Sequence, residues 1–396
     1  MQAERPAQST VILTTTATIY SDFILVFVSF IVIFVFMQAA FNANQQQNHH
    51  RRRLHRPPPS RRDIRPDRDG PAAPPPVPQA QGVVQDSRRR RCKRIADGTI
   101  DALQKGYYHE PVAHSNRLLR YDISADLRLT ERHTVFYPDD AIELHRWQMT
   151  HPPQRHHNRP TKLFLLPLST LEGARYMDSL VSTAHNSPLK PLMGVLNFAS
   201  ATRPGGGFLN GALAQEESIA RSSSLYISLA TATANQFYSS HIHDTRGGFY
   251  THAMIYSPNV ILFRTDDGDW LKPVRVEVVT SPAVNAKEAR ERYRNQVQAG
   301  GDGGRAGSQL EVLIRDVMRE RMARVLALFE LRGVKHIVLG SFGTGVFQND
   351  VRVVAGIWRE LVYGRHARFA TSFDNVLFAI PDKRTMDKFK DGFGPI

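Results

Sequence analysis

The chain has 396 residues, enough for two average domains or one domain with extensions, and its 41% hydrophobic content allows an ordinary apolar core. The formal charge is +14, but residues 1–94 alone hold 15 Lys/Arg against 6 Asp/Glu, so most of the basic excess belongs to an N-terminal tail and sequence-specific nucleic-acid binding is not expected. Cys92 is the only cysteine, which excludes a disulfide framework and a cysteine-based zinc site.

Residues 23–41 carry no charge and are rich in Phe, Val and Ile. Because that length just spans a hydrocarbon core, we predict a transmembrane helix there, after a short N-terminal segment at 1–22. Eight arginines follow between Arg51 and Arg68, and the positive-inside rule then turns the C-terminal part towards the cytosol of a single-pass membrane protein. An uncleaved targeting segment or a mispredicted first exon are the alternatives, with a cytoplasmic or nuclear protein as the result.

Residues 42–90 mix Gln, Arg, Pro and Asp with few large apolar side chains. Such a segment cannot bury enough surface to offset the entropy lost on ordering, so we predict a disordered Arg/Pro-rich linker. From Arg88 to Arg94, six of seven residues are basic. That run fits a nuclear localisation signal, contact with anionic lipid or a solvated surface.

We expect the folded domain over residues 91–396. Strands alternating with helices favour an α/β sandwich with a largely parallel sheet. Short apolar runs predict strands at 163–166, 193–198, 254–256, 260–263, 274–279, 336–339 and 376–380, and helical spacing predicts helices at 171–184, 218–229, 286–297, 309–331 and 351–362.

Two glycine-rich motifs directly follow predicted strands. The first runs from Asn197 through Gly205-Gly206-Gly207 to Gln215-Glu216-Glu217, and the second is the stretch 340–347, Gly-Ser-Phe-Gly-Thr-Gly-Val-Phe. In α/β sheets, ligands bind beyond the carboxyl ends of the strands, and glycines there can present backbone N–H groups to phosphate oxygens. The spacing fits neither a dinucleotide fingerprint nor a P-loop, so the pair suggests two loops gripping one diphosphate.

The adjacent glutamates indicate carboxylate chemistry. If the segment is locally extended, the two side chains point to opposite sides, so that one could bind sugar hydroxyls while the other faces a scissile bond. Sequence neighbours cannot form the opposed carboxylate pair of ordinary glycosidases, so one glutamate would act first as acid and then as base. Alternatively, the two glutamates have no catalytic role and are present because carboxylates stabilise the first turn of a helix.

From about Cys92 to Asp382 the sequence resembles the microbial-type poly(ADP-ribose) glycohydrolases. The resemblance rests on the two glycine motifs and on four further matches, at 94–107, 218–223, 257–264 and 281–285. It implies a macrodomain, a three-layer α/β/α sandwich with a mixed, largely parallel sheet that binds ADP-ribose.

The resemblance also implies roles for individual residues. Glu217 protonates the departing ribose oxygen and then activates water, Glu216 holds hydroxyls at the linkage, and Phe378 is a candidate for the aromatic wall of the adenine site. The substrate-binding set that it implies is Asn197 for the terminal ribose, Gln215 in the signature, Gly205, Gly206, Gly207, Gly343, Thr344, Gly345 and Val346 around the diphosphate, and Phe347 against a ribose.

The implied reaction is hydrolysis of ribose–ribose O-glycosidic bonds, in poly(ADP-ribose) or on ADP-ribosylated proteins, without a metal or cofactor. Thr344 departs from the cysteine expected in many relatives. Two alternatives stay open: a non-catalytic reader of ADP-ribose, and a hydrolase of mono-ADP-ribose or another ADP-ribose derivative. The intact Gln215-Glu216-Glu217 argues against the reader, which needs no acid.

Overall fold

A computed structural model describes residues 79–149, 160–184, 191–242, 245–298 and 303–396. The chain divides into two units, Met1–Pro76 and Val77–Ile396, and all described residues belong to the second. The elements in chain order are α2 (Gln79–Lys105), β1 (Tyr107–Pro111), β2 (Leu118–Asp122), α3 (Ser124–Arg132), β3 (Val135–Tyr137), α4 (Ile142–His145), β4 (Lys162–Leu166), α5 (Thr170–Ala184), β5 (Met193–Phe198), the 3-10 turn η1 (Phe208–Asn210), α6 (Gln215–Ser222), α7 (Leu225–Leu229), α8 (Ala232–Ile242), β6 (Met254–Arg264), β7 (Trp270–Ser281), α9 (Ala286–Gln298), α10 (Gly303–Leu331), β8 (His336–Leu339), α11 (Val351–Val362), β9 (Asn375–Ala379) and α12 (Lys383–Phe393).

Seven strands form a mixed sheet in the order β3-β6-β7-β5-β8-β9-β4. The pairs β5–β7, β5–β8, β8–β9 and β4–β9 are parallel, whereas β3–β6 and β6–β7 are antiparallel. A separate antiparallel hairpin consists of β1 and β2. The parallel part of the sheet places β5 between β7 and β8, so the loops that follow these three strands leave the same edge.

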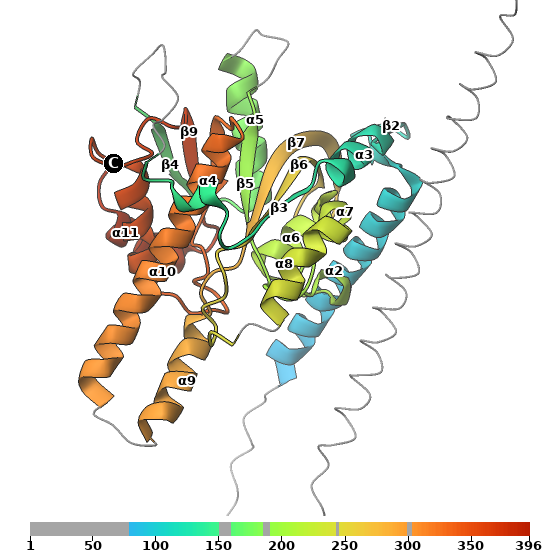
Figure 1. Cartoon of the computed structure of the whole chain (residues 1–396). Helices are drawn as coiled ribbons and strands as arrows, with labels where there is room; N and C mark the ends of the chain where they lie inside the picture. Colours follow the sequence, from blue (N-terminus) through green and yellow to red (C-terminus); the bar gives the residue numbers. More distant parts are fainter. Residues whose placement is uncertain (1–78, 150–159, 185–190, 243–244, 299–302) are drawn as a thin grey trace, which may run out of the picture. The chain divides into compact units, whose positions relative to one another are not determined.

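Alternating strand residues feed two apolar cores, one on each face of the sheet. In β5, Leu196 joins the core that includes α10 and α11, while Val195 joins the core that includes α5 and α8. Ile337 and Val338 of β8 divide in the same way. Because both faces are covered, the parallel strands are apolar on both sides and read as continuous hydrophobic runs. The helices of the two layers can be followed around the sheet in Figure 1.

Several predicted elements match the structure closely. Strands β5 and β8 and helix α11 have the predicted bounds. The two runs at 254–256 and 260–263 instead form one strand, β6, with a register shift between Ser257 and Val260 where Asn259 adopts a positive φ of 55°. The predicted helix 218–229 is divided into α6 and α7 by Ser223, whose backbone is extended.

Helix α2 begins at Gln79, inside the range predicted to be a disordered linker. The boundary at residue 91 is therefore too late for the ordered part of the chain. Most residues of this stretch tolerate a helix well, and Arg90 pairs with Asp86 one turn earlier at 3.0 Å. From Cys92 onward the helix also buries an apolar stripe that includes Ile95 and Ala96. Residues 42–78 lie outside the described residues.

The prediction of a transmembrane helix is corrected. Among the residues that the structure describes, no helix is both long and apolar enough to cross a bilayer. The two longest, α2 with 27 residues and α10 with 29, carry charged side chains along their length, whereas a spanning helix needs about 20 predominantly apolar residues. Residues 1–22 and 23–41, on which the prediction was based, lie outside the described residues. The fold class is thus mixed α/β without that helix, and the membrane contact and single-pass localisation are withdrawn.

Candidate active site

Both glycine motifs lie at one edge of the sheet, as predicted. Asn197 near the end of β5 pairs with Thr280 of β7, and β8 runs parallel to β5 on its other side. The segment that carries Gly205–Gly207 follows β5, and the segment that begins at Gly340 follows β8. The structure therefore brings the two predicted loops to the carboxyl ends of adjacent strands.

Gln215 fastens the start of α6 to β5. Its side-chain oxygen accepts a hydrogen bond from the Phe198 N–H at 2.9 Å, and its side-chain nitrogen donates to the Leu196 carbonyl at 2.8 Å and to the Thr170 hydroxyl at 3.1 Å. The side-chain amide thereby bonds one N–H group and one carbonyl group of the β5 backbone, as a neighbouring strand would. This contact fixes the position of the two glutamates that follow.

Glu216 is the buried member of the carboxylate pair, with 2% of its surface exposed. It accepts hydrogen bonds from the Ser200 N–H at 2.7 Å and from the Asn197 side-chain amide at 3.3 Å. Burial raises the pKa of Glu216 to about 8, and the neighbouring Glu217 carboxylate adds to the rise, although the bond from Ser200 opposes it. A carboxyl group in this position retains a proton near neutral pH.

Glu217 is the accessible member of the pair. Its carboxylate accepts a hydrogen bond from the Gly207 N–H at 2.9 Å, and its side chain is partly exposed. Gly206 lies beside it with a φ of +60°, and a Cβ atom at that position would collide with the Glu217 carboxylate and approach Glu216. The triple glycine thus leaves the carboxylate uncovered, and only glycine suits both the backbone and the space.

The two glutamates are helical, contrary to the extended geometry considered above. They occupy the first turn of α6, which begins at Gln215, so their side chains diverge by the helical step of about 100° per residue. The alternative considered above, that the two glutamates lie in the first turn of a helix, is therefore correct as a description of where they lie. The divergence still directs Glu216 to β5 and Glu217 to the glycine turn.

Asn197 is fully buried beneath the pair. Its side-chain nitrogen donates to Glu216 and, at 3.2 Å, to the Thr280 hydroxyl. Within the described part of the chain its side-chain oxygen has no hydrogen-bond partner. Buried polar atoms normally have partners, so this oxygen is an unsatisfied acceptor directly beneath the glutamate pair.

The second loop is shaped by Asn349. Its side-chain nitrogen donates to the Gly343 carbonyl at 2.9 Å and to the Val284 carbonyl at 2.7 Å. Gly343 has a φ of +72°, and a Cβ atom there would collide with Ala283. The Thr344 hydroxyl donates to the Ser341 carbonyl at 2.9 Å, so this side chain closes the turn from within.

The tip of this loop is open. A Cβ atom at Gly345 would meet nothing within 4 Å, and Val346 has 74% of its surface exposed. Phe347 is partly buried against the main core, and its ring centroid lies 6.1 Å from that of Tyr250. The backbone of the loop is therefore free to approach a ligand, with an aromatic side chain at its end.

Phe378 does not lie at this site. It is fully buried in β9, and its ring packs against Trp358, Phe389 and Phe393. The suggestion of Phe378 as an adenine wall is wrong, because the side chain belongs to the core between the sheet and helices α11 and α12.

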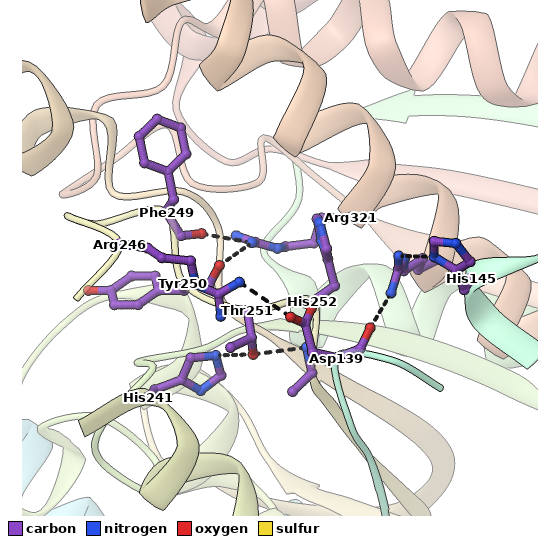
Figure 2. Close-up of polar contacts among 11 residues, drawn as sticks. Asp139, His145, His241, Arg246, Phe249, Tyr250, Thr251, His252 and Arg321 are labelled. Atoms are coloured by element: carbon purple, nitrogen blue, oxygen red, sulfur yellow. Dashed lines mark hydrogen bonds and ion pairs between the residues drawn. The ribbon is translucent and has the colours of Figure 1, made fainter. Parts of the chain in front are cut away.

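A polar network behind Tyr250 was not predicted from the sequence. Arg321 of α10 is fully buried and donates to the carbonyls of Phe249 at 2.7 Å and Pro282 at 3.0 Å, and Figure 2 shows it reaching the loop before β6. Tyr250 in that loop has a positive φ of 53°. Arg321 thus joins the loop after β7 to the loop before β6.

The same loop is held from its other side by Asp139, which accepts hydrogen bonds from the His252 N–H at 2.7 Å and from Arg246 at 3.3 Å (Figure 2). Burial, with Arg321 nearby, lowers the pKa of His252 to about 3, so this ring is neutral. Arg321 sits in a stretch whose apolar spacing indicates only a core helix, so the sequence gives no signal of these contacts.

A family model and several solved structures indicate the same family. The family described as microbial-type PARG, catalytic domain, matches residues 96–265. The poly(ADP-ribose) glycohydrolase from Thermomonospora curvata is 34% identical with a TM-score of 0.61, and the match covers 78% of this chain and 100% of that one. The enzyme from Deinococcus radiodurans, solved in complex with ADP-ribose, is 31% identical with a TM-score of 0.55, over 67% of this chain and 96% of that one.

Among curated proteins, no relative matches. The Thermomonospora enzyme is nevertheless matched along its whole length at 34% identity, and the range 96–265 matched by the family model contains the first glycine motif and Gln215-Glu216-Glu217. The chain therefore belongs to the microbial-type poly(ADP-ribose) glycohydrolase family.

Proposed function

We propose that this protein hydrolyses the ribose–ribose O-glycosidic bonds of poly(ADP-ribose), free or attached to proteins, and releases ADP-ribose, with Glu217 as general acid and base. The observation that carries the proposal is the setting of the Glu217 carboxylate, which is held by the Gly207 N–H at 2.9 Å in a turn without side chains. Family membership supports the reaction class, since the named relatives are poly(ADP-ribose) glycohydrolases.

Glu217 suits the proton transfers better than Glu216 does. Glu216 is buried and accepts hydrogen bonds from Ser200 and Asn197, which fix the orientation of its carboxyl group and suit it to positioning a substrate more than to transferring protons. Glu217 is partly exposed and has one hydrogen bond from the glycine turn. In the first step Glu217 gives its proton to the departing ribose oxygen as the glycosidic bond breaks. It then takes a proton from the water that attacks the anomeric carbon, and so returns to its starting state.

Glu216 and Asn197 are proposed to hold the hydroxyls of the ribose at the scissile bond. The free side-chain oxygen of Asn197 can accept from one hydroxyl, and Glu216 lies beside it at 3.3 Å from the Asn197 nitrogen. A ribose seated there would lie next to Glu217. Positioning of this kind contributes to catalysis because it replaces a chance encounter with a fixed approach.

The two glycine loops are proposed to bind the diphosphate. Residues 205–207 and 343–346 bring their backbone to the same edge of the sheet. The N–H groups of Gly206, Gly207 and Thr344 already bond the Arg203 carbonyl, Glu217 and the Ser341 carbonyl, so the open tip at Gly345 is where a charged group can approach the backbone most closely. Phosphate oxygens accept hydrogen bonds from such backbone groups readily. Phe347, partly buried at the end of the second loop, would pack against a ribose.

Product analysis tests the proposal. The full chain is incubated with poly(ADP-ribose), and polymer length and free ADP-ribose are measured together. We expect progressive shortening with release of ADP-ribose by the wild type and by Glu143→Gln, a control that removes an exposed carboxylate on α4, but not by Glu217→Gln. Binding of the polymer without shortening by the wild type would make the protein a reader, and release of only the protein-linked unit would make it a mono-ADP-ribose hydrolase.

A further inference from the structure

Helix α6, which carries Glu217, begins without a side-chain cap. Its N-cap residue is Ala214, which has no side-chain oxygen to accept a hydrogen bond from the free N–H groups of the first turn. The helix has only eight residues, and so short a helix is marginal without support from the rest of the protein. The first turn therefore depends on contacts with other elements for its position.

Asp266 provides one of these contacts from the turn between β6 and β7. One of its carboxylate oxygens accepts a hydrogen bond from the hydroxyl of Ser218, the residue directly after Glu217. The other oxygen accepts from the Ser169 hydroxyl at 2.5 Å. Hydrogen bonds to a carboxylate are stronger than those between neutral groups. A single partly buried carboxylate thus bridges the first turn of α6 and the residue before α5.

The start of α5 is a firm anchor for this bridge. Ser169 and Glu172 cap the helix reciprocally: the Ser169 hydroxyl accepts from the Glu172 N–H at 3.1 Å, and the Glu172 carboxylate accepts from the Ser169 N–H at 2.7 Å. The next residue, Thr170, accepts a hydrogen bond from the Gln215 side chain at 3.1 Å. The two residues that flank the glutamate pair are therefore fastened to the same helix start, one directly and the other through Asp266.

We propose that Asp266 is a positioning residue, which holds the first turn of α6 so that the Glu217 carboxylate stays at the glycine turn. The inference rests on the proposed function and deepens it. Asp266 acts through Ser218 and not on the substrate. Without the bridge the first turn can shift relative to the glycine turn, and a general acid that is displaced by about 1 Å can lose on the order of 100-fold in rate. The loops proposed to bind the diphosphate keep their own contacts, so the loss falls on kcat.

The test uses four variants of the full chain. Asp266→Ala removes both hydrogen bonds, and Ser218→Ala removes only the bond to α6 and keeps a good helix former. The double variant removes no further contact between this turn and α6. The matched control is Asp267→Ala, which removes the next carboxylate of the same turn, a side chain that is 73% exposed and pairs with Arg91 at 3.1 Å. Urea unfolding of each variant separates loss of folding from loss of rate.

Kinetics on poly(ADP-ribose) give the first result. We expect Asp266→Ala and Ser218→Ala to lower kcat by similar factors of about 10- to 100-fold. KM should stay within about two-fold of the wild type, because the lost contact acts on the reacting group and not on substrate binding. The double variant should fall no further than the slower single variant, since the two residues act through one hydrogen bond. Asp267→Ala should match the wild type.

Hydrogen exchange of the Gly207 amide gives a second result that needs no activity. This N–H bonds the Glu217 carboxylate at 2.9 Å, so its exchange rate, measured by NMR, reports whether Glu217 stays in place. The rate should be several-fold higher in Asp266→Ala and Ser218→Ala than in the wild type and in Asp267→Ala.

A wild-type kcat in Asp266→Ala, losses that multiply in the double variant, or an unchanged exchange rate of the Gly207 amide would overturn the inference. Failure of the proposed function looks different. In that case the wild type does not shorten polymer at all, and the exchange rate alone then decides whether Asp266 holds Glu217 in position.

Discussion

Glu216 and Glu217 are neighbours in sequence, yet the first turn of α6 gives their carboxylates different surroundings. Glu216 is buried against β5, where Ser200 donates to it at 2.7 Å, and Glu217 faces the glycine turn. A helix separates adjacent side chains by about 100°, which suffices to place one in the interior and one at the surface. This difference in surroundings supports the separate roles proposed for the two residues, in which Glu216 holds a sugar and Glu217 transfers a proton.

Burial of Glu216 makes stability depend on pH. Its pKa is about 8 in the folded protein against 4.5 for the ordinary group, so the folded state retains a proton that the unfolded chain releases. The free energy of unfolding then falls as pH rises from about 4.5 to about 8, by up to about 1.4 kcal/mol per pH unit. Glu216→Gln, which cannot ionise, should lack this loss. Urea unfolding at pH 5 and pH 8 gives the free energy of unfolding of both proteins. From pH 5 to pH 8, this free energy should fall by a few kcal/mol more for the wild type than for the variant. If the difference in free energy between the two proteins is the same at both pH values, burial does not raise the pKa of Glu216.

Gly206 is predicted to tolerate no side chain. Alanine there would strain a backbone at φ +60° and push the Glu217 carboxylate away, and small misplacements of a catalytic group cost about 100-fold in rate. Gly333→Ala is the matched control, because φ is +69° and the space around its Cβ is empty. We expect both variants to lose about 1 kcal/mol of stability, whereas only Gly206→Ala loses polymer turnover. Normal turnover by Gly206→Ala would show that the turn does not position Glu217.

At the scale of elements, helix α11 supports the second glycine loop. Its N-cap residue Asp350 accepts hydrogen bonds from the backbone of Arg352 at 2.8 Å and Val353 at 3.1 Å, directly after the loop that ends at Asn349. Asp382 caps α12 in the same way, with a bond from Thr385 at 2.8 Å, but no glycine loop precedes it. The two caps therefore form a natural pair for comparison.

Replacing either cap by alanine should cost about 1 kcal/mol of stability, measured by urea unfolding. Only Asp350→Ala should also weaken ADP-ribose binding several-fold in titration calorimetry, because the start of α11 and the loop before it share a backbone. If Asp382→Ala weakened binding equally, the loss would reflect general destabilisation and not the loop.

Element prediction from the sequence succeeded where one signal dominated. The apolar runs of β5 and β8 are buried on both faces, and the apolar spacing of α11 is strongly helical, so their bounds were predictable. The bounds of an element were not predictable where tertiary contacts determine them. Ser223 divides the predicted helix 218–229 because its backbone forms a bridge with Leu262 of β6. Likewise, the start of α2 at Gln79 lies within a polar stretch that has no core signal.

At the scale of the whole molecule, the glycine motifs sufficed to place the candidate site. Loops that follow parallel strands leave the carboxyl edge of the sheet, and the sheet order places β5 beside β8. The support behind the site was not predictable. Arg321 reaches Phe249 and Pro282 from a helix far away in sequence, and nothing local distinguishes it from a surface arginine. The same limit explains Phe378, whose aromatic character suits a core as well as a ligand wall.

The most direct test of the central claim is a single-turnover measurement with Glu217→Gln. The full chain is mixed in excess over poly(ADP-ribose), and the rate of bond cleavage and the affinity for ADP-ribose are measured for this variant and the wild type. We predict a cleavage rate lower by about 10²- to 10⁴-fold, as expected when a general acid–base is removed, with ADP-ribose affinity within a few-fold of wild type. Cleavage at the wild-type rate would contradict the assignment of Glu217.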